Sequence, residues 1–212
     1  MKDSWFIEPY KLKKINFRGK TNIRYPKDFV KKILIEFTRK GDIVFDPFAG
    51  FGTTLFVAQE LKRIGIGIEY DQKHYDYIKK QLKNPSKIIH GNSLKINSYR
   101  LPKFDFCMTS PPYMRYFDRE DPFTNYTKPG NYLKYLKDIR KIFLKIKQKM
   151  KENATLIIEV SNTFDKHHPM TPLAWDIARE LSKIFFFERE IIYGVKNSAG
   201  NTHSYLLLFI NK

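Results

Sequence analysis

Cysteine is almost absent from this sequence: Cys107 is the only one among 212 residues. A single cysteine excludes an internal disulfide and a zinc site built on cysteines. Because Cys107 lies in the apolar stretch 104–108, we expect it to be a buried core thiol. Asp165, His167 and His168 could suggest another kind of metal site, but side chains this close along the chain do not easily converge on one ion. We therefore predict a surface loop there and no metal site.

Long apolar runs are also lacking. No stretch reaches the roughly 18 consecutive apolar residues that a membrane-spanning helix needs, and no signal peptide is recognisable. These absences predict a cytoplasmic protein with no membrane partner. Hydrophobic residues still make up 42% of the chain, enough for a substantial core, and 212 residues fit one domain. We predict a single domain that spans residues 1–212.

Acidic residues are scarce relative to basic ones. The sequence has 22 Asp and Glu against 39 Lys and Arg, which gives a formal net charge of +17. This excess favours a polyanionic partner such as nucleic acid, because each neutralised phosphate releases condensed counterions. A lysine-rich surface that maintains solubility, or a composition adapted to heat, is the alternative.

Two basic segments are candidates for contact with such a partner. Residues 1–26 interleave basic with aromatic side chains, a composition that binds single strands by stacking and charge. The alternative for this N-terminal arm is that it packs on the sheet. The second segment is the lysine-rich face of a helix over 134–151, whose alternative is a solvated helix exterior.

Apolar runs of strand length alternate with helical patterns along the chain. Strands are expected over 43–45, 64–69, 87–90, 104–108, 155–160, 186–193 and 204–210, with helices after Pro26, over 53–63, around 75–82, over 136–150 and from an N-cap at Thr171. Strands joined by helical crossovers form a mostly parallel sheet covered on both faces. The turn at 197–201 is too short for a crossover. We predict an α/β fold with a doubly wound, seven-stranded, mostly parallel sheet and an antiparallel last strand.

The first chemical motif runs from Asp46 to Thr54, between an expected strand and an expected helix, where open α/β sheets bind ligands. Gly50 and Gly52 let the backbone turn sharply and approach a ligand closely. Thr53 or Thr54 can cap the helix, whose positive end favours a carboxylate. The motif lacks both the third glycine of a dinucleotide site and a Walker lysine. It therefore predicts a site for a nucleoside without phosphates.

Glu69 ends the next expected strand. An acidic residue at this place accepts hydrogen bonds from ribose hydroxyls in the dinucleotide fold, and we expect the same here. Taken alone, the glycine turn could be structural and Glu69 a solvated strand-end carboxylate. Their joint occurrence in strand–turn–helix order predicts a cofactor site.

The second motif, Thr109-Ser110-Pro111-Pro112-Tyr113, follows the fourth expected strand directly. Proline carries no N–H, so this turn displays acceptor oxygens in a fixed direction. Ser110 and the Pro111 carbonyl could accept hydrogen bonds from an amino group, and Tyr113 offers a flat face for a nucleic-acid base. The alternative is a rigid Pro-Pro loop with a core tyrosine. The shared sheet edge with the glycine turn favours a catalytic motif.

With these two motifs in this order, the chain resembles the amino-methyltransferases of nucleic acids, which include DNA cytosine-N4 and adenine-N6 methylases. The resemblance implies a Rossmann-like class I methyltransferase fold, S-adenosylmethionine as cofactor and methyl transfer to an exocyclic amino nitrogen. Such a nitrogen is a poor nucleophile, so Ser110, Pro111, Pro112 and Tyr113 would act mainly by positioning it. The Ser-Pro-Pro-Tyr form is most often linked to cytosine N4, and Asp-Pro-Pro-Tyr to adenine N6.

The resemblance also implies the cofactor contacts. Tyr25 would flank the cofactor, Glu69 would bind its ribose, and Asn92 stands where the family usually has an acidic residue near the adenine ring. The expected cofactor-binding residues are Tyr25, Asp46, Pro47, Phe48, Gly50, Gly52, Thr53, Thr54, Glu69, Asn92, Ser93 and Thr109.

One part of the family pattern is missing. DNA methylases of this group usually carry a sizeable region that reads bases in the major groove, whereas only residues 114–131 separate the catalytic motif from the next helix here. We expect a lid or substrate loop, in which the residues available for phosphates and bases are Arg115, Tyr116, Phe117, Arg119, Phe123 and Tyr126. So short a loop suits structured RNA, ribosomal or transfer, which is recognised by shape and by unstacked bases. DNA methylation at cytosine N4 or adenine N6 is the main alternative.

Two further alternatives are open. The acceptor could be guanine N2 in RNA or a glutamine amide of a protein, although a net charge of +17 fits a protein acceptor poorly. The other alternative is a catalytically silent RNA-binding or assembly protein of the same fold. Such a protein would have little reason to keep both the glycine turn and Glu69.

Overall fold

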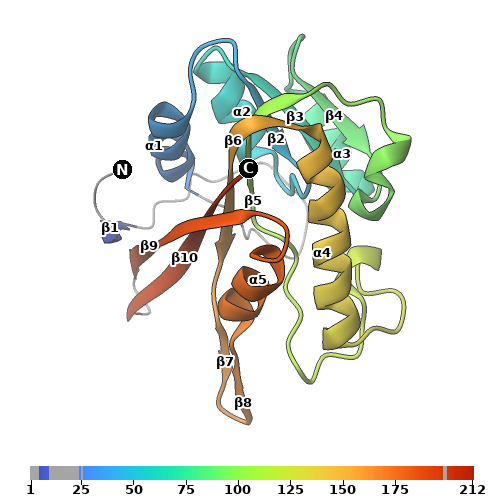
Figure 1. Ribbon diagram of the computed structural model, residues 1–212, viewed down its shortest axis with the longest axis vertical. Helices are drawn as coiled ribbons and strands as arrows, with labels where there is room; N and C mark the ends of the chain where they lie inside the picture. The colour runs from blue at the N-terminus through green and yellow to red at the C-terminus, as the bar shows by residue number, and fades with distance from the viewer. Residues whose placement is uncertain (1–4, 10–23, 25, 198–199) are drawn as a thin grey trace.

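The computed structural model describes residues 5–9, 24, 26–197 and 200–212, which are built around an eight-stranded sheet (Figure 1). The strand order is β1-β9-β10-β6-β5-β2-β3-β4. The bounds are β1 Trp5–Pro9, β2 Ile43–Asp46, β3 Ile64–Glu69, β4 Lys87–His90, β5 Phe104–Thr109, β6 Met150–Val160, β9 Phe186–Asn197 and β10 Gly200–Ile210. All neighbours are parallel except β10, which is antiparallel to both β6 and β9.

The seven strands expected from the sequence are all present, and the antiparallel last strand is confirmed. β1 adds an eighth strand at the edge, where Trp5 lies opposite Ile192 and Pro9 opposite Lys196. Residues 5–9 of the N-terminal arm therefore pack on the sheet, which was one of its two alternatives. Residues 1–4, 10–23 and 25 lie outside the described residues.

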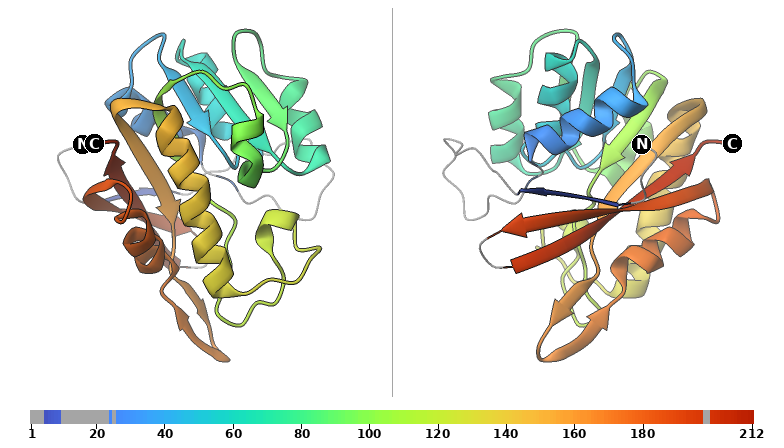
Figure 2. Two further views of the ribbon diagram at one scale, coloured as in Figure 1. Left: turned by 45° about the vertical axis from the view of Figure 1, so that its right-hand side comes forward. Right: turned by 90° about the vertical axis from the view of Figure 1, so that its left-hand side faces the viewer.

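Helices cover both faces of the sheet (Figure 2). They are α1 (Lys27–Phe37), α2 (Thr53–Glu60), α3 (Gln72–Lys79), α4 (Tyr132–Lys149) and α5 (Leu173–Leu181). α4 and α5 pack on one face, while α1 and α2 pack on the other, and α3 packs beside α2 through Ile78. Because both faces are covered, the consecutive residues Ile157 and Ile158 of β6 are both buried, in opposite cores. Cys107 is likewise a buried free thiol.

α4 follows the predicted pattern, with Leu136, Ile139, Phe143 and Ile146 buried. Its lysine-rich outer face is only partly free for a partner. Lys134 forms ion pairs with Asp121 and Asp138, and Lys145 donates to the carbonyl of Leu94 at 2.7 Å. These lysines thus help to attach α4 to neighbouring segments.

The helix expected to follow an N-cap at Thr171 has a different start: its N-cap is Pro172 and its first residue Leu173. The hydroxyl oxygen of Thr171 instead accepts a hydrogen bond from the backbone N–H of Tyr116 at 3.2 Å. Asn162, from the preceding connection, accepts from the N–H of Ala174 at 2.9 Å and so satisfies the helix start.

The loop expected around Asp165 is a short hairpin of β7 (Thr163–Asp165) and β8 (His168–Thr171), which projects beyond the main sheet (Figure 1). Asp165 closes the turn by accepting from the N–H of His167 at 2.8 Å. Among the described residues no group of three His, Cys, Asp or Glu side chains could hold a metal ion. The described residues also contain no helix that is long and apolar enough to cross a membrane.

Candidate active site

Asp46 ends β2 with its carboxylate buried beneath the glycine turn. It accepts hydrogen bonds from the N–H of Phe48 at 3.1 Å and from the hydroxyl of Thr109 at 2.7 Å. Burial raises the pKa of Asp46 to about 6, and these hydrogen bonds oppose the rise. Asp46 therefore stabilises the turn through Phe48 and connects it to Thr109 at the end of β5.

The turn requires glycine at two positions. Gly50 has φ of 54° and Gly52 has φ of 74°, values that glycine adopts without strain. A Cβ atom on Gly52 would also lie 2.8 Å from the side chain of Ile78. The N-cap of α2 is Gly52 itself, so neither Thr53 nor Thr54 caps this helix through its side chain.

Glu69 ends β3 directly beside the turn. Its Oε2 accepts from the N–H of Gly50 at 2.6 Å, and its Oε1 accepts from the N–H of Asp71 at 2.7 Å. Burial raises the pKa of Glu69 to about 7, against the effect of these two hydrogen bonds. The carboxylate is therefore held in one orientation by the two backbone segments that frame it.

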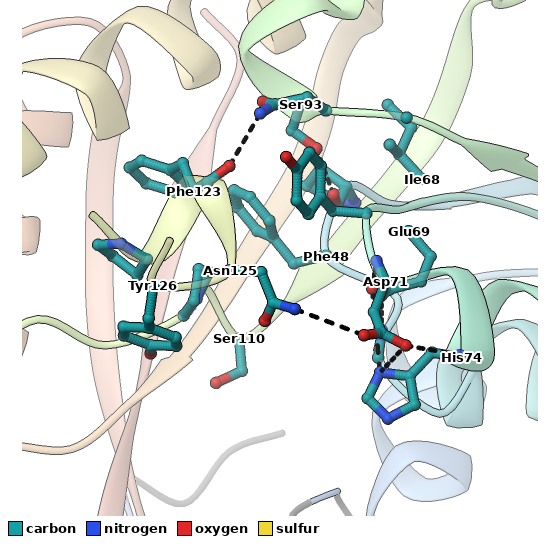
Figure 3. Close-up of a pocket in the computed structure, with 17 residues that line it drawn as sticks. Phe48, Ile68, Glu69, Asp71, His74, Ser93, Ser110, Phe123, Asn125 and Tyr126 are labelled. Atoms are coloured by element: carbon teal, nitrogen blue, oxygen red, sulfur yellow. Dashed lines mark hydrogen bonds and ion pairs between the residues drawn. The ribbon is translucent and has the colours of Figure 1, made fainter. Parts of the chain in front are cut away.

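A pocket opens where β2, β3 and β4 end (Figure 3). The expected cofactor-binding residues that line it are Pro47, Phe48, Gly50, Glu69, Asn92 and Ser93. Asp71 and His74 lie on one side of the pocket and Tyr126 on the other, with Asn125 between them (Figure 3). The pocket thus combines carboxylates on one side with aromatic rings on the other.

The turn after β4 is attached to both neighbouring segments. The hydroxyl of Ser93 donates to the carbonyl of Pro47. The side chain of Asn92 accepts from the N–H of Leu94 and donates to the carbonyl of Phe123, each at 2.8 Å. Both the oxygen and the nitrogen of the Asn92 side chain therefore make hydrogen bonds in the wall of the pocket.

A wall of the pocket comes from the segment 114–131, which the sequence predicts to be a lid or substrate loop. Its short 3-10 helix η2 (Pro122–Thr124) places the Phe123 ring against Phe48, with 5.8 Å between centroids. Asn125 reaches Asp71 at 3.5 Å across the pocket. The Asp-Pro start of η2 is a recognisable capping signal, but its place opposite Phe48 depends on tertiary contacts.

The catalytic motif borders the same pocket. Ser110 and Pro112 line it, while Pro111 is buried behind them. The carbonyl of Pro112 accepts from the hydroxyl of Tyr135 at 3.0 Å. The phenol oxygen of Tyr113 accepts from the N–H of Ser161 at 2.7 Å, and burial raises the pKa of Tyr113. The motif is therefore held by α4 on one side and by the end of β6 on the other.

Glu159 is a residue of this region that the sequence did not reveal. It lies on β6, partly buried, and interaction with the hydroxyls of Ser110 and Ser204 favours its ionised form. Burial raises its pKa. A charged residue in the apolar run 156–160 was the available signal, since such residues are rarely buried without partners.

A second hollow lies next to the pocket. It is lined by Tyr113, Arg115, Phe117, Asp118, Arg119, Glu120, Tyr126, Thr163 and Phe164. Tyr126 lines both cavities, and its hydroxyl donates to the carbonyl of Tyr113 at 3.2 Å. Three of the expected substrate residues, Arg115, Phe117 and Arg119, therefore border one space beside the catalytic motif.

The other expected site residues lie outside both cavities. Tyr116 donates to the buried carboxylate of Asp176 at 3.1 Å, and its ring packs against Tyr132. The expected cofactor-binding residues that do not line the pocket are Asp46, Gly52, Thr53, Thr54 and Thr109. Tyr25 lies outside the described residues.

A family model described as DNA methylase matches residues 1–80 and 104–209. The type II methyltransferase M.HinfI of Haemophilus influenzae is 40% identical over 81 residues, which are 36% of this chain and 22% of that protein. The orphan methyltransferase M.BamHII of Bacillus amyloliquefaciens is 35% identical over 79 residues, or 37% of this chain and 29% of that protein. The aligned part thus covers under a third of the length of these curated relatives.

Solved structures show the same fold. TrmN from Thermus thermophilus is 13% identical, with a TM-score of 0.62, over 87% of this chain and 48% of that chain. An rRNA methylase from Streptococcus thermophilus is 14% identical, with a TM-score of 0.59, over 90% of this chain and 99% of that chain. At these identities the likeness concerns the fold alone.

Proposed function

Because this chain belongs to the DNA methylase family, we propose that it transfers a methyl group from S-adenosylmethionine to an exocyclic amino nitrogen of a nucleic-acid base. We propose N4 of cytosine as that nitrogen. The observation that carries the proposal is that the glycine turn, Glu69 and Ser110 line one pocket at the sheet edge. A binding protein without catalysis would need the pocket but not the serine and prolines beside it.

The chemistry of the pocket fits this cofactor. Glu69 and Asp71 offer carboxylate oxygens that suit ribose hydroxyls and positively charged groups, and they would repel a phosphate. Phe48 and Phe123 offer aromatic faces for an adenine ring. When bound there, S-adenosylmethionine supplies an electrophilic methyl group on a sulfonium.

The residues of the chain then hold the acceptor amine. Ser110 lines the pocket and interacts with Glu159, and a hydroxyl that donates to this carboxylate would keep its lone pairs available to accept from the amino group. Tyr113, fixed by the N–H of Ser161, presents a face on which an extruded base can stack. These contacts would align the nitrogen with the methyl group, and such positioning supplies much of the rate in reactions of this type.

For the polymer, we propose structured RNA, ribosomal or transfer. Residues 114–131 contribute one wall of the cofactor pocket and part of the second hollow, so little of this segment is left to read a duplex. DNA is the second candidate, supported by the description of the family model. An aromatic hollow suits unpaired bases in either polymer.

The test is incubation with methyl-labelled S-adenosylmethionine and, in parallel, duplex DNA, single-stranded DNA, transfer RNA and undermodified ribosomal RNA. Each polymer is digested to nucleosides and the labelled nucleoside is identified by mass. N4-methylcytidine from RNA is the expected product. N4-methyldeoxycytidine or label on adenine N6 would retain the reaction class and correct the substrate, and no transfer to any polymer would contradict the proposal.

A further inference from the structure

The β7–β8 hairpin carries an unusually exposed aromatic side chain. Phe164, in the middle of β7, is 80% exposed, more than any other large hydrophobic residue whose exposure is described. Single apolar residues on a surface are common, so exposure alone does not indicate a function. The residues around Phe164, however, indicate a function for its side chain.

The hairpin is fixed to the segment that follows the catalytic motif. The ring of His168 stacks on Phe117 with 3.8 Å between centroids and 17° between planes. The guanidinium of Arg115 lies 4.4 Å from the centre of the Phe117 ring and 3.8 Å from the carboxylate of Asp165. Phe164 therefore lies on a hairpin that contacts with Phe117 and Arg115 hold in place.

Phe164 also borders the hollow beside the catalytic motif. The aromatic residues that line this hollow are Tyr113, Phe117, Tyr126 and Phe164. Aromatic side chains bind unpaired bases by stacking, whatever the base. Phe164 sits at the open rim, whereas Tyr113 is adjacent to Ser110 and Pro112 of the pocket. A strand that delivers its target base to Tyr113 would therefore bring a neighbouring nucleotide close to Phe164.

Charge contributes little at this place. Arg115 and Arg119 border the hollow, but so do Asp118 and Glu120, and Arg115 forms a salt bridge with Asp118. Attraction of phosphates is thus nearly balanced by repulsion, and stacking is the dominant contact that the hollow offers.

We propose that Phe164 stacks on an unpaired nucleobase next to the target base and so holds the substrate strand against the hairpin. The inference rests on the proposed function, because it assumes that the target base enters beside Tyr113. It adds a substrate contact outside the catalytic motif and outside residues 114–131.

The experiment compares Phe164→Ala with Phe186→Ala. Phe186 is a half-exposed aromatic residue that pairs with Ile210, and Ile210 pairs with Thr155 in the middle of β6. Phe164, in contrast, follows the Val160 end of β6. The probe is a short oligocytidylate, as RNA and as DNA, and its affinity is measured at low and high salt. Calorimetry with S-adenosylmethionine serves as the folding control.

We expect Phe164→Ala to weaken oligocytidylate binding by about fivefold or more at both salt concentrations, since loss of one stacked base costs about 1 kcal/mol or more. Phe186→Ala and cofactor binding should be unaffected. In a Phe164→Trp variant, the added tryptophan fluorescence should be quenched by the oligonucleotide, measured as the difference from the parent chain.

Unchanged binding and unquenched fluorescence, together with continued methyl transfer, would overturn the role of Phe164 and leave the proposed function intact. Loss of self-association as the sole effect of Phe164→Ala would also overturn it, since the ring would then be a contact between copies. Failure of every polymer to accept a methyl group would remove both proposals.

Discussion

The hydroxyl of Thr109 donates a hydrogen bond to the buried carboxylate of Asp46 at 2.7 Å, across 63 positions of sequence. Asp46 ends β2 and Thr109 ends β5, the two adjacent parallel strands from which the glycine turn and the catalytic motif depart. This contact therefore adds to the pairing of β2 with β5 and helps to fix the position of the two motifs relative to each other.

Replacement of Thr109 by valine tests this connection. Thr109→Val retains the shape of the side chain but removes the donor to a buried carboxylate, which typically costs roughly 2 kcal/mol. We expect a loss of about that size in the free energy of unfolding, measured by urea denaturation, and weaker binding of S-adenosylmethionine in calorimetry. Thr127→Val is the matched control, because the Thr127 hydroxyl makes only an exposed contact with the carbonyl of Thr124. Equal stability of the two variants would show that the Asp46 contact is dispensable.

The ionisation of Glu69 should appear in both stability and cofactor binding. Its pKa is raised from 4.5 to about 7 by burial, so the folded protein holds a proton that the unfolded chain releases between these values. The contribution of Glu69 to the free energy of unfolding therefore falls as the pH rises from about 4.5 to 7, by roughly 3 kcal/mol at most, and is constant at higher pH. Urea denaturation of Glu69→Gln should show a flatter profile over this range.

Cofactor affinity should change in the opposite direction, because ribose hydroxyls donate to the ionised carboxylate. We expect the affinity for S-adenosylmethionine to increase as the pH rises through about 7 and Glu69 loses its proton. Glu69→Gln should bind more weakly at pH 8 and lose this dependence in calorimetry. A pH dependence that persists in the variant would assign it to another group.

The catalytic motif allows a separation of stacking from hydrogen bonding. Tyr113→Ala removes the ring, and we expect about a 5- to 150-fold loss of methyl transfer, the range for one lost base stack. Tyr113→Phe keeps the ring and loses the hydroxyl, which accepts from the Ser161 N–H and interacts with Ser110, so transfer should fall less than in Tyr113→Ala while stability falls by about 1–3 kcal/mol. Equal loss of transfer in the two variants would contradict a stacking role.

Ser110→Ala should reduce methyl transfer by roughly 100-fold, since misplacement of a reacting group can cost this much. Binding of S-adenosylmethionine should persist, because the cofactor motif is intact. The measurement is single-turnover transfer to the substrate found in the polymer test. Full activity of the variant would mean that backbone oxygens alone orient the amine.

The parts of the fold that could be predicted from the sequence are those with local signals. Glycine turns and acidic residues at strand ends must lie at one sheet edge once the strands are parallel, so the sequence places Gly50 and Glu69 at one edge, and both line the pocket. β1 gave no such signal, because it is short and pairs with a strand almost the whole chain away. Its pairing depends on an edge that only the complete sheet provides.

The substrate loop illustrates the same limit. Tyr116 is an aromatic residue of the kind expected to contact nucleic acid, but its hydroxyl donates to Asp176 on α5, 60 residues away. Phe123 belongs to the segment predicted to contact substrate, yet it stacks between Phe48 and Tyr135 in the wall of the cofactor pocket. Contacts of this kind depend on how α4 and α5 pack on the sheet, and no local pattern in 114–131 specifies them.

Asn92 stands where the family usually has an acidic residue, and we expect an acidic residue there to weaken cofactor binding in this chain. Its side chain accepts from the N–H of Leu94 and donates to the carbonyl of Phe123. An aspartate retains the first contact but places a carboxylate against a carbonyl oxygen, and unlike the amide it has no proton to donate. We expect Asn92→Asp to loosen η2 and to lower the affinity for S-adenosylmethionine in calorimetry. Asn92→Ala, which removes both contacts without adding charge, separates repulsion from simple loss. If Asn92→Asp bound the cofactor more tightly than the parent chain, the acidic residue would contact the cofactor directly and the bond to Phe123 would be incidental.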